Sequence, residues 1–155
     1  MGIINIDEWE SASKMRENPY NDDGAGTVYD ILIDNKINLY NAGDIETHFN
    51  FRVDFIRDKI PSAKIYIDGD ASRQLYWGAM TAKGGDAYVK INTKLNIIEG
   101  YNSEGIKTGN VYNQHIKAGT FFKIPLGESV LFLQNDNNII ENLEQNPIEY
   151  DYYYF

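Results

Sequence analysis

Apolar and polar residues alternate along most of the chain from about residue 27 onward. The longest run is 45–55, in which the odd-numbered positions are mainly apolar and the even-numbered positions are polar. Successive side chains of a β-strand point to opposite faces, so this period of two predicts a half-buried strand. Similar patterns or strand-forming residues predict further strands at 28–33, 37–40, 63–67, 74–78, 87–91, 95–98, 120–124, 129–133 and 148–155.

Turn-forming residues separate the predicted strands. Gly, Asp, Asn and Pro gather at 34–35, 41–44, 68–70, 83–86, 103–105 and 125–128, where they favour reversal of the chain. Many short strands with one apolar face predict an all-β domain, built as an antiparallel sandwich or barrel. Beyond the first turns of chain, only 139–143 suggests a short helical turn, so we do not expect a doubly wound α/β fold.

The first 25 residues have a different character. Asp7 followed by Glu10 is typical of a helix start, because an aspartate cap is often paired with a glutamate three residues later. The helix must end before Pro19, and 18–26 is rich in turn-forming residues. We therefore predict a short N-terminal helix and linker at 1–25 and a β-sandwich domain at 26–155.

Composition and charge exclude several classes of function. The chain has 155 residues, 14 Lys and Arg against 23 Asp and Glu, a net charge of −9, and no cysteine. An acidic chain is unsuited to neutralising nucleic-acid phosphates or to docking on an anionic membrane. No apolar run approaches the roughly 20 residues of a membrane helix, and the start lacks the features of a signal peptide. We expect no nucleic-acid partner, no membrane insertion and no thiol chemistry.

No catalytic group stands out. His48 and His115 are the two residues that titrate near neutral pH by default, and neither has a second histidine at metal-ligand spacing. The Gly-x-Ser-x-Gly turn of many serine hydrolases is absent from the sequence. We interpret both histidines as surface residues and predict no catalytic site and no cofactor.

Two acidic turns are weak candidates for calcium. Asp22 and Asp23 precede Gly24, and Asp68 and Asp70 flank Gly69. Each turn supplies only two carboxylates, whereas calcium takes six to eight oxygen ligands. Asp and Gly also favour turns for conformational reasons alone. We therefore predict no metal site at either turn.

Two aromatic segments are candidates for contact with a partner or a glycan. Trp77 and Tyr76, with Arg73 nearby, have the residue types of a sugar-binding surface, although we favour a core position for Trp77 and a sheet-covering one for Tyr76. At the end of the chain, Tyr150, Tyr152 and Tyr154 would share one face of a strand. That strand either completes a sheet, which we favour, or presents an aromatic surface.

Two motifs carry a resemblance to a known family. Residues 41–46 spell Asn-x-Gly-Asp-x-Glu before the alternating strand, and 119–128 read Gly-Thr-Phe-Phe-Lys-Ile-Pro-Leu-Gly-Glu. Residues 91–93 and 97–98, followed by a loop at 102–109, add to the pattern. Over 26–155 the chain resembles the C-terminal domain of phage distal tail proteins. The resemblance implies an antiparallel β-sandwich of galectin-like, jelly-roll-like or carbohydrate-module-like form.

The resemblance also implies a place and a role. The domain would be a structural part of the virion tail tip, made in the bacterial cytoplasm, and would act as an adaptor for other tail, baseplate or adsorption proteins. In such relatives it sometimes contacts host surface glycan, so a carbohydrate-binding module is the alternative function. Residues 1–25 are too short for the family's ring-forming domain, so we expect a monomer or small oligomer and no hexameric ring. An enzyme is the third and weakest possibility.

Overall fold

The computed structural model describes residues 25–30, 36–135 and 148–153. The helix expected within 1–25 and the turn expected at 139–143 lie outside the described residues. In the described part, no helix has the length and apolar character that crossing a membrane requires.

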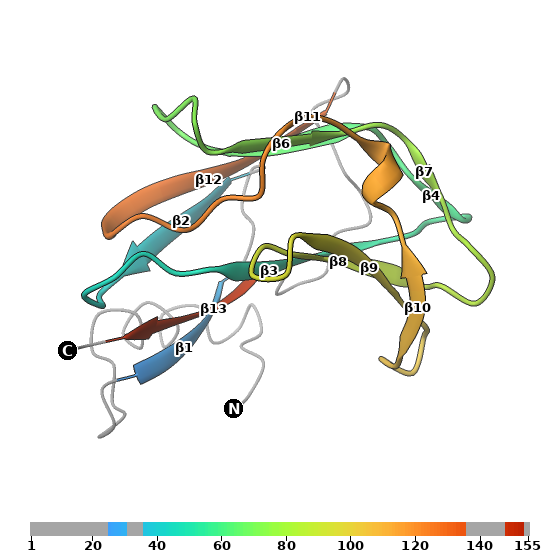
Figure 1. Ribbon diagram of the computed structural model, residues 1–155, viewed down its shortest axis with the longest axis horizontal. Helices are drawn as coiled ribbons and strands as arrows, with labels where there is room; N and C mark the ends of the chain where they lie inside the picture. Colours follow the sequence, from blue (N-terminus) through green and yellow to red (C-terminus); the bar gives the residue numbers. More distant parts are fainter. Residues whose placement is uncertain (1–24, 31–35, 136–147, 154–155) are drawn as a thin grey trace.

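Two antiparallel sheets form the molecule, and they lie one above the other as the layers of a sandwich (Figure 1). The six-stranded sheet, here called sheet A, has the order β1 (Ala25–Asp30), β13 (Ile148–Tyr153), β3 (Phe49–Asp54), β8 (Tyr88–Asn92), β9 (Ile97–Tyr101) and β10 (Lys107–Val111). The five-stranded sheet B has the order β11 (Ile116–Gly119), β6 (Gln74–Trp77), β5 (Ala63–Ile67), β12 (Gly127–Asn135) and β2 (Lys36–Asn41). A small third sheet pairs β4 (Lys59–Ile60) with β7 (Met80–Thr81). The predicted antiparallel β-sandwich is confirmed.

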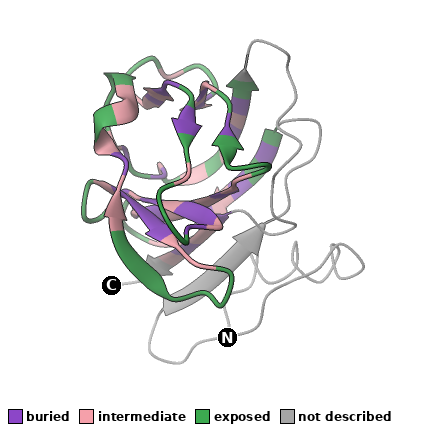
Figure 2. Ribbon diagram, turned by 90° about the vertical axis from the view of Figure 1, so that its right-hand side faces the viewer, coloured by how far each residue is buried: buried purple, intermediate pink, exposed green. Residues whose placement is uncertain are grey.

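The core lies between the two sheets. Figure 2 shows buried segments gathered between the layers and exposed stretches in the connecting loops. In β3 the odd-numbered residues Phe49, Phe51 and Val53 are buried, and the residues between them are partly exposed. The same alternation holds along β5 and β6, so the period of two in the sequence is the period of burial in the structure.

The last described strand lies inside sheet A. β13 pairs with β1 along six residues, from Ala25 opposite Tyr153 to Asp30 opposite Ile148, and with β3 on its other side. Ile148 and Tyr150 point into the core. The prediction that this tyrosine-rich segment completes a sheet is confirmed for 148–153.

Two predicted strands are displaced or shortened. The strand expected at 95–98 begins at Ile97, because Asn96 adopts a left-handed φ of 55° and Leu95 lies in the turn with 61% of its surface exposed. The strand expected at 45–55 is regular only over Phe49–Asp54. Thr47 forms a single bridge with Ile124, and Ile45 is 39% exposed in the preceding bend.

The segment 120–124 is not a strand. The backbone N–H of Thr120 still bonds the carbonyl of Gln74, but Ile124 bridges to Thr47 instead. The segment therefore runs from sheet B toward the start of β3, and its backbone has no continuous partner strand. Phe122 is buried, and Phe121 packs partly buried against the core.

Two short polar strands have no apolar pattern in the sequence. Residues 107–111 overlap the expected loop at 102–109, but they form β10 against β9. β11 likewise pairs with β6 although its last three residues are exposed. Such edge strands bury little side-chain surface, so they carry no apolar alternation.

Candidate functional site

The Asn-x-Gly-Asp-x-Glu motif builds a tight bend between sheets B and A. Asn41 is buried, and its side chain donates from Nδ2 to the carbonyl of Ile45 at 2.9 Å and accepts from the N–H of Gly43 at 3.0 Å. A Cβ at Gly43 would lie 2.6 Å from the backbone nitrogen of Tyr153. Glycine is therefore needed here for the close approach of β13, and the N–H of Asp44 bonds the carbonyl of Tyr153.

The second motif meets the first at this same place. Thr47 and Ile124 exchange backbone hydrogen bonds of 3.2 and 2.7 Å. Beneath this bridge the rings of Phe49 and Phe122 pack with their centroids 5.2 Å apart. Segments about 75 residues apart in the sequence thus form one edge of the sandwich, called here the motif edge (residues 41–49 and 119–124).

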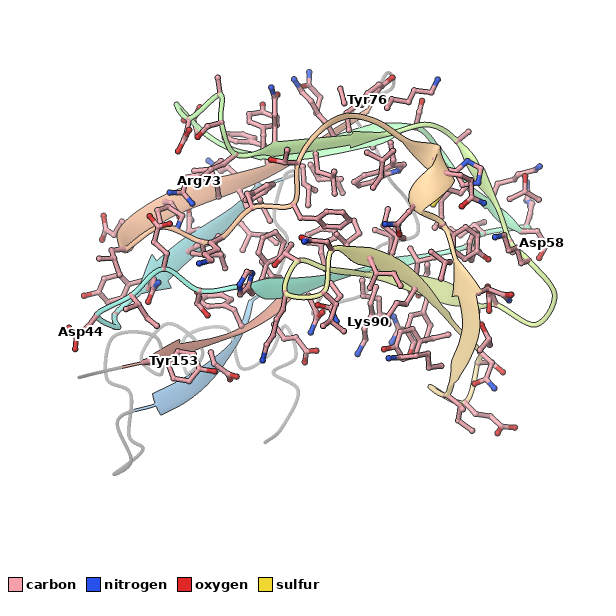
Figure 3. The ribbon with its side chains drawn as sticks, in the orientation of Figure 1. Asp44, Asp58, Arg73, Tyr76, Lys90 and Tyr153 are labelled. Atoms are coloured by element: carbon pink, nitrogen blue, oxygen red, sulfur yellow. The ribbon has the colours of Figure 1, made fainter. Side chains whose placement is uncertain are left out.

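Arg73 ties the motif edge to the β5–β6 turn. Its guanidinium donates to Asp70 and Glu46 at 2.8 Å each and to the carbonyl of Lys123 at 2.7 Å. Burial lowers the pKa of Arg73, but the hydrogen bonds to Glu46 and Asp70 outweigh it and raise the pKa above its usual value. Figure 3 places Arg73, Asp44 and Tyr153 at one end of the molecule and Asp58 at the other. Arg73 was predicted as a contact residue, and in the structure it joins three segments of the chain through hydrogen bonds.

A groove of about 610 Å³ opens beside the motif edge. It is lined by residues 45–50, by Asn92 and Lys94, by Lys123, and by Glu149, Tyr150, Asp151 and Tyr153. Its walls come from the motif bend, from the chain just after β8 and from β13. Ligand sites typically have volumes of about 300–1,000 Å³, so this groove is the candidate functional site.

One side of the groove carries positive charge. Burial, followed by the ammonium groups of Lys123 and Lys94, lowers the pKa of His48 below its usual value. The Nδ1 atom of His48 is buried and has no hydrogen-bond partner among the described residues. A neutral ring with its proton on Nε2 leaves only a lone pair there, whereas a charged ring would bury an unpaired donor. Neutral histidine beside two lysines is the favoured state.

The other side of the groove is acidic and hydrogen-bonded. Glu149 accepts from Nδ2 of Asn50 at 3.2 Å and lies 3.7 Å from Nζ of Lys90. The hydroxyl of Tyr153 donates to Asp151 at 3.2 Å, and the Tyr153 side chain is 40% exposed. The groove thus offers amides, carboxylates, ammonium groups and one exposed aromatic ring. These groups suit hydrogen bonding and ion pairing with a ligand.

The sequence-predicted contact residues are mostly elsewhere. Trp77 is 1% exposed and donates from Nε1 to the carbonyl of Pro61, so it is a core residue, and a contact role for its ring is wrong. Tyr150 does line the groove, but it is buried, with its hydroxyl 3.4 Å from the backbone N and O of Tyr40. Tyr76 is partly exposed on the outer side of sheet B (Figure 3). The side chain of Tyr152 and all of Tyr154 lie outside the described part.

A second polar cluster surrounds Asp86. This buried carboxylate accepts hydrogen bonds from the hydroxyls of Thr108 and Tyr112 and, at 3.0 Å, from Nδ2 of Asn110. Burial and then the bond to Asp86 raise the pKa of Tyr112 to about 12. A Cβ at Gly100 would overlap the carboxylate. Through Thr108 and Asn110, the cluster anchors β10 to Asp86.

Of the two acidic turns considered for calcium, the one at 68–70 lies in the described part, and its Asp70 carboxylate already accepts hydrogen bonds from neighbouring residues. Hydrogen bonds from the hydroxyl and N–H of Ser72, and then from Arg73, lower the pKa of Asp70. Across the described residues, no three His, Asp or Glu side chains gather as metal ligands. Asp22 and Asp23 lie outside the described part.

Sequence reasoning missed the groove as a unit. The polar positions His48, Lys94 and Lys123 are ordinary surface residues in a linear pattern, and only the strand register brings them together. The available signal was the pair of motifs, whose meeting point forms one wall. No family model matches the chain, and no curated protein matches it.

Proposed function

We propose that this domain is an adaptor of the phage tail tip, equivalent to the outer domain of a distal tail protein. The observation that carries the proposal is the motif edge. The two segments on which the resemblance depends meet through the Thr47–Ile124 bridge and the Phe49–Phe122 contact. Two motifs that form one structural unit support a common origin better than two motifs that lie apart.

The geometry suits an adaptor that presents a fixed surface. Arg73 holds three segments together at the motif edge, and the groove beside it has polar groups on rigid strands. A preorganised surface loses little conformational entropy when a partner binds. Lys94 and Lys123 form no ion pair with any described residue and are therefore available to an incoming carboxylate.

The experiment that tests the proposal is direct binding to neighbouring tail proteins. The products of the reading frames beside this gene are purified and passed over the immobilised full chain. At least one of these products should bind with 1:1 stoichiometry. The proposal would be contradicted if none of the neighbouring reading frames encoded a tail component. Lys123→Glu tests the groove, with Lys59→Glu as the matched charge reversal on an exposed lysine outside it.

The groove itself favours a second candidate function, binding of a carbohydrate. Asn50, Asn92 and Glu149 offer amide and carboxylate groups for sugar hydroxyls, and the exposed Tyr153 ring provides an aromatic surface at the rim. The volume accommodates a ligand of a few sugar units. This candidate is compatible with the adaptor function, because an outward-facing tail domain can hold both a protein and a glycan.

A glycan array with the full chain tests this second candidate. A glycan bound through the groove should lose most of its signal with Tyr153→Ser and keep it with Leu126→Ser. Leu126 is 50% exposed and lies outside the groove. Equal loss in both variants would place the glycan elsewhere, and no signal with the unmodified chain would contradict glycan binding.

A further inference from the structure

The outer faces of the two sheets differ in whether their cationic side chains form ion pairs with described residues. On sheet A, Arg52 pairs with Asp54 at 2.8 Å, Lys90 with Glu149 at 3.7 Å, and Lys107 with Glu99 at 3.1 Å. These cations are neutralised by neighbours on the same face. Lys36, Lys64 and Lys117 of sheet B belong to strands β2, β5 and β11 and form no ion pair with any described residue.

Aromatic rings lie among the lysines of sheet B. Tyr66 and Phe132 are opposite each other on β5 and β12, and their rings stack with centroids 5.4 Å apart at 14°. Tyr76 on β6 is opposite Lys64 and therefore diagonal to Tyr66. All three rings are partly exposed, and Figure 3 shows Tyr76 on the side of sheet B that faces away from sheet A. We call this set (Lys36, Lys64, Tyr66, Tyr76, Lys117 and Phe132) the outer face of sheet B.

This face is cationic on an acidic protein. The chain carries a net charge of −9, yet Glu128 is the one acidic side chain at the outward positions of the described strands of sheet B. Three lysines against one glutamate give a positive patch. Such a patch attracts a surface of opposite sign, whereas two whole copies, each with a net charge of −9, repel each other at long range.

The state of the rings distinguishes between classes of ligand. Sugars bind aromatic residues through a free ring face, but Tyr66 stacks on Phe132 and has Nζ of Lys64 4.8 Å from its centroid. Rings engaged in this way offer edges and a hydroxyl. Tyrosine edges with surrounding cations suit protein contacts, where tyrosine supplies area at low entropic cost.

We infer that the outer face of sheet B docks an acidic protein surface. The partner presents carboxylates opposite Lys36, Lys64 and Lys117, and aromatic or aliphatic groups opposite Tyr66, Tyr76 and Phe132. The inference rests on the proposed adaptor function and names the chemistry of its partner. It also gives Tyr76 a role on this face, separate from the groove.

Fluorescence anisotropy of the full chain with labelled poly-glutamate tests the charge component. The double variant Lys36→Glu with Lys64→Glu should weaken binding at least tenfold, and added salt should weaken it in the unmodified chain. The matched control is Arg57→Glu with Lys59→Glu, two exposed residues at the β3–β4 turn with the same change of charge. It should change the dissociation constant by less than about twofold, because exposed charges separated by more than about 10 Å are largely screened. Equal weakening in both double variants, or no binding by the unmodified chain, would overturn the inference.

A glutamate–tyrosine copolymer tests the aromatic component. It should bind more tightly than poly-glutamate, and Tyr76→Ser should remove the difference while melting at an unchanged temperature. Hyaluronate bound through the same lysines as tightly as poly-glutamate would assign the face to an acidic polysaccharide instead. If light scattering shows self-association and the Lys36→Glu, Lys64→Glu variant abolishes it, the outer face of sheet B would be assigned to a second copy. Either of these results overturns the inference, as does a copolymer that binds no more tightly than poly-glutamate. Binding of tail proteins tests the adaptor function separately.

Discussion

At the scale of single residues, the position of an aromatic residue in the alternation decides whether its side chain is buried or exposed. Tyr76 and Trp77 are neighbours on β6, yet Trp77 is buried and Tyr76 is partly exposed. The alternation in the sequence places successive residues on opposite faces. It does not say which outward ring is available to a ligand, because that depends on cross-strand neighbours such as Phe132 for Tyr66.

The central core position of Phe51 gives a first prediction. Phe51 is fully buried on β3, between Ile148 on β13 and Ile91 on β8. Phe51→Ala should lower the free energy of unfolding by about 3–5 kcal/mol, measured by urea denaturation. Ile106→Ala is the control, because Ile106 is 57% exposed and should change stability by less than about 0.5 kcal/mol. A loss below about 1 kcal/mol at Phe51 would mean that the faces of β3 are reversed.

His48 gives a prediction about pH. Its pKa is lowered in the folded protein by burial, Lys123 and Lys94, so the unfolded chain binds the proton more readily. The free energy of unfolding should therefore be unaffected above the unfolded pKa of about 6.5 and fall as the pH drops below it. His48→Gln should reduce this fall in urea titrations across that range. Identical pH profiles for the two proteins would contradict the proposed environment of His48.

At the scale of elements, the strands with an apolar face were predictable and the polar edges were not. β3, β5 and β6 follow from alternation alone. β10 has no apolar alternation, because its side chains Thr108 and Asn110 bond Asp86 instead of packing in the core. The shift of β9 depends on the left-handed Asn96, a conformation that composition does not specify.

Gly119 at the end of β11 gives a prediction for an element. Its φ is +81°, and a Cβ would overlap the carbonyl of Gln74 on β6. Gly119→Ala should destabilise the protein by more than the roughly 1–3 kcal/mol of left-handed strain alone. Gly69→Ala separates the two effects, because Gly69 has a φ of +77° but no atom near its Cβ position. Gly84→Ala, with neither constraint, should be almost neutral in thermal melts. Equal losses at Gly69 and Gly119 would contradict the close approach of β11 to β6.

At the scale of the whole molecule, the sandwich brings together what the sequence separates. The motif edge joins residues near 45 with residues near 122, and the groove adds β13 from the end of the chain. The motifs were recognisable in the sequence, but their contact was not, since no linear pattern fixes which strands are neighbours. Within the described part of the chain, Lys36, Lys64 and Lys117 of sheet B form no ion pair, whereas Lys90 and Lys107 of sheet A do.

The acidic turns give a prediction about metal ions. Asp70 already accepts hydrogen bonds from Ser72 and Arg73, so we expect folding to be independent of calcium. The melting temperature should be the same with chelator and with millimolar calcium. A ligand at a hundred times its dissociation constant stabilises a protein by about 2.7 kcal/mol, so a rise of several degrees would reveal a calcium site.

The central claim is that this sandwich is an adaptor at the tip of a phage tail. The most direct measurement is immunogold electron microscopy of particles assembled from the genome that encodes the chain, with an antibody raised against the domain. The account predicts gold at the end of the tail farthest from the head. Gold on the head, gold along the tail tube, or particles that carry none of the protein would contradict it.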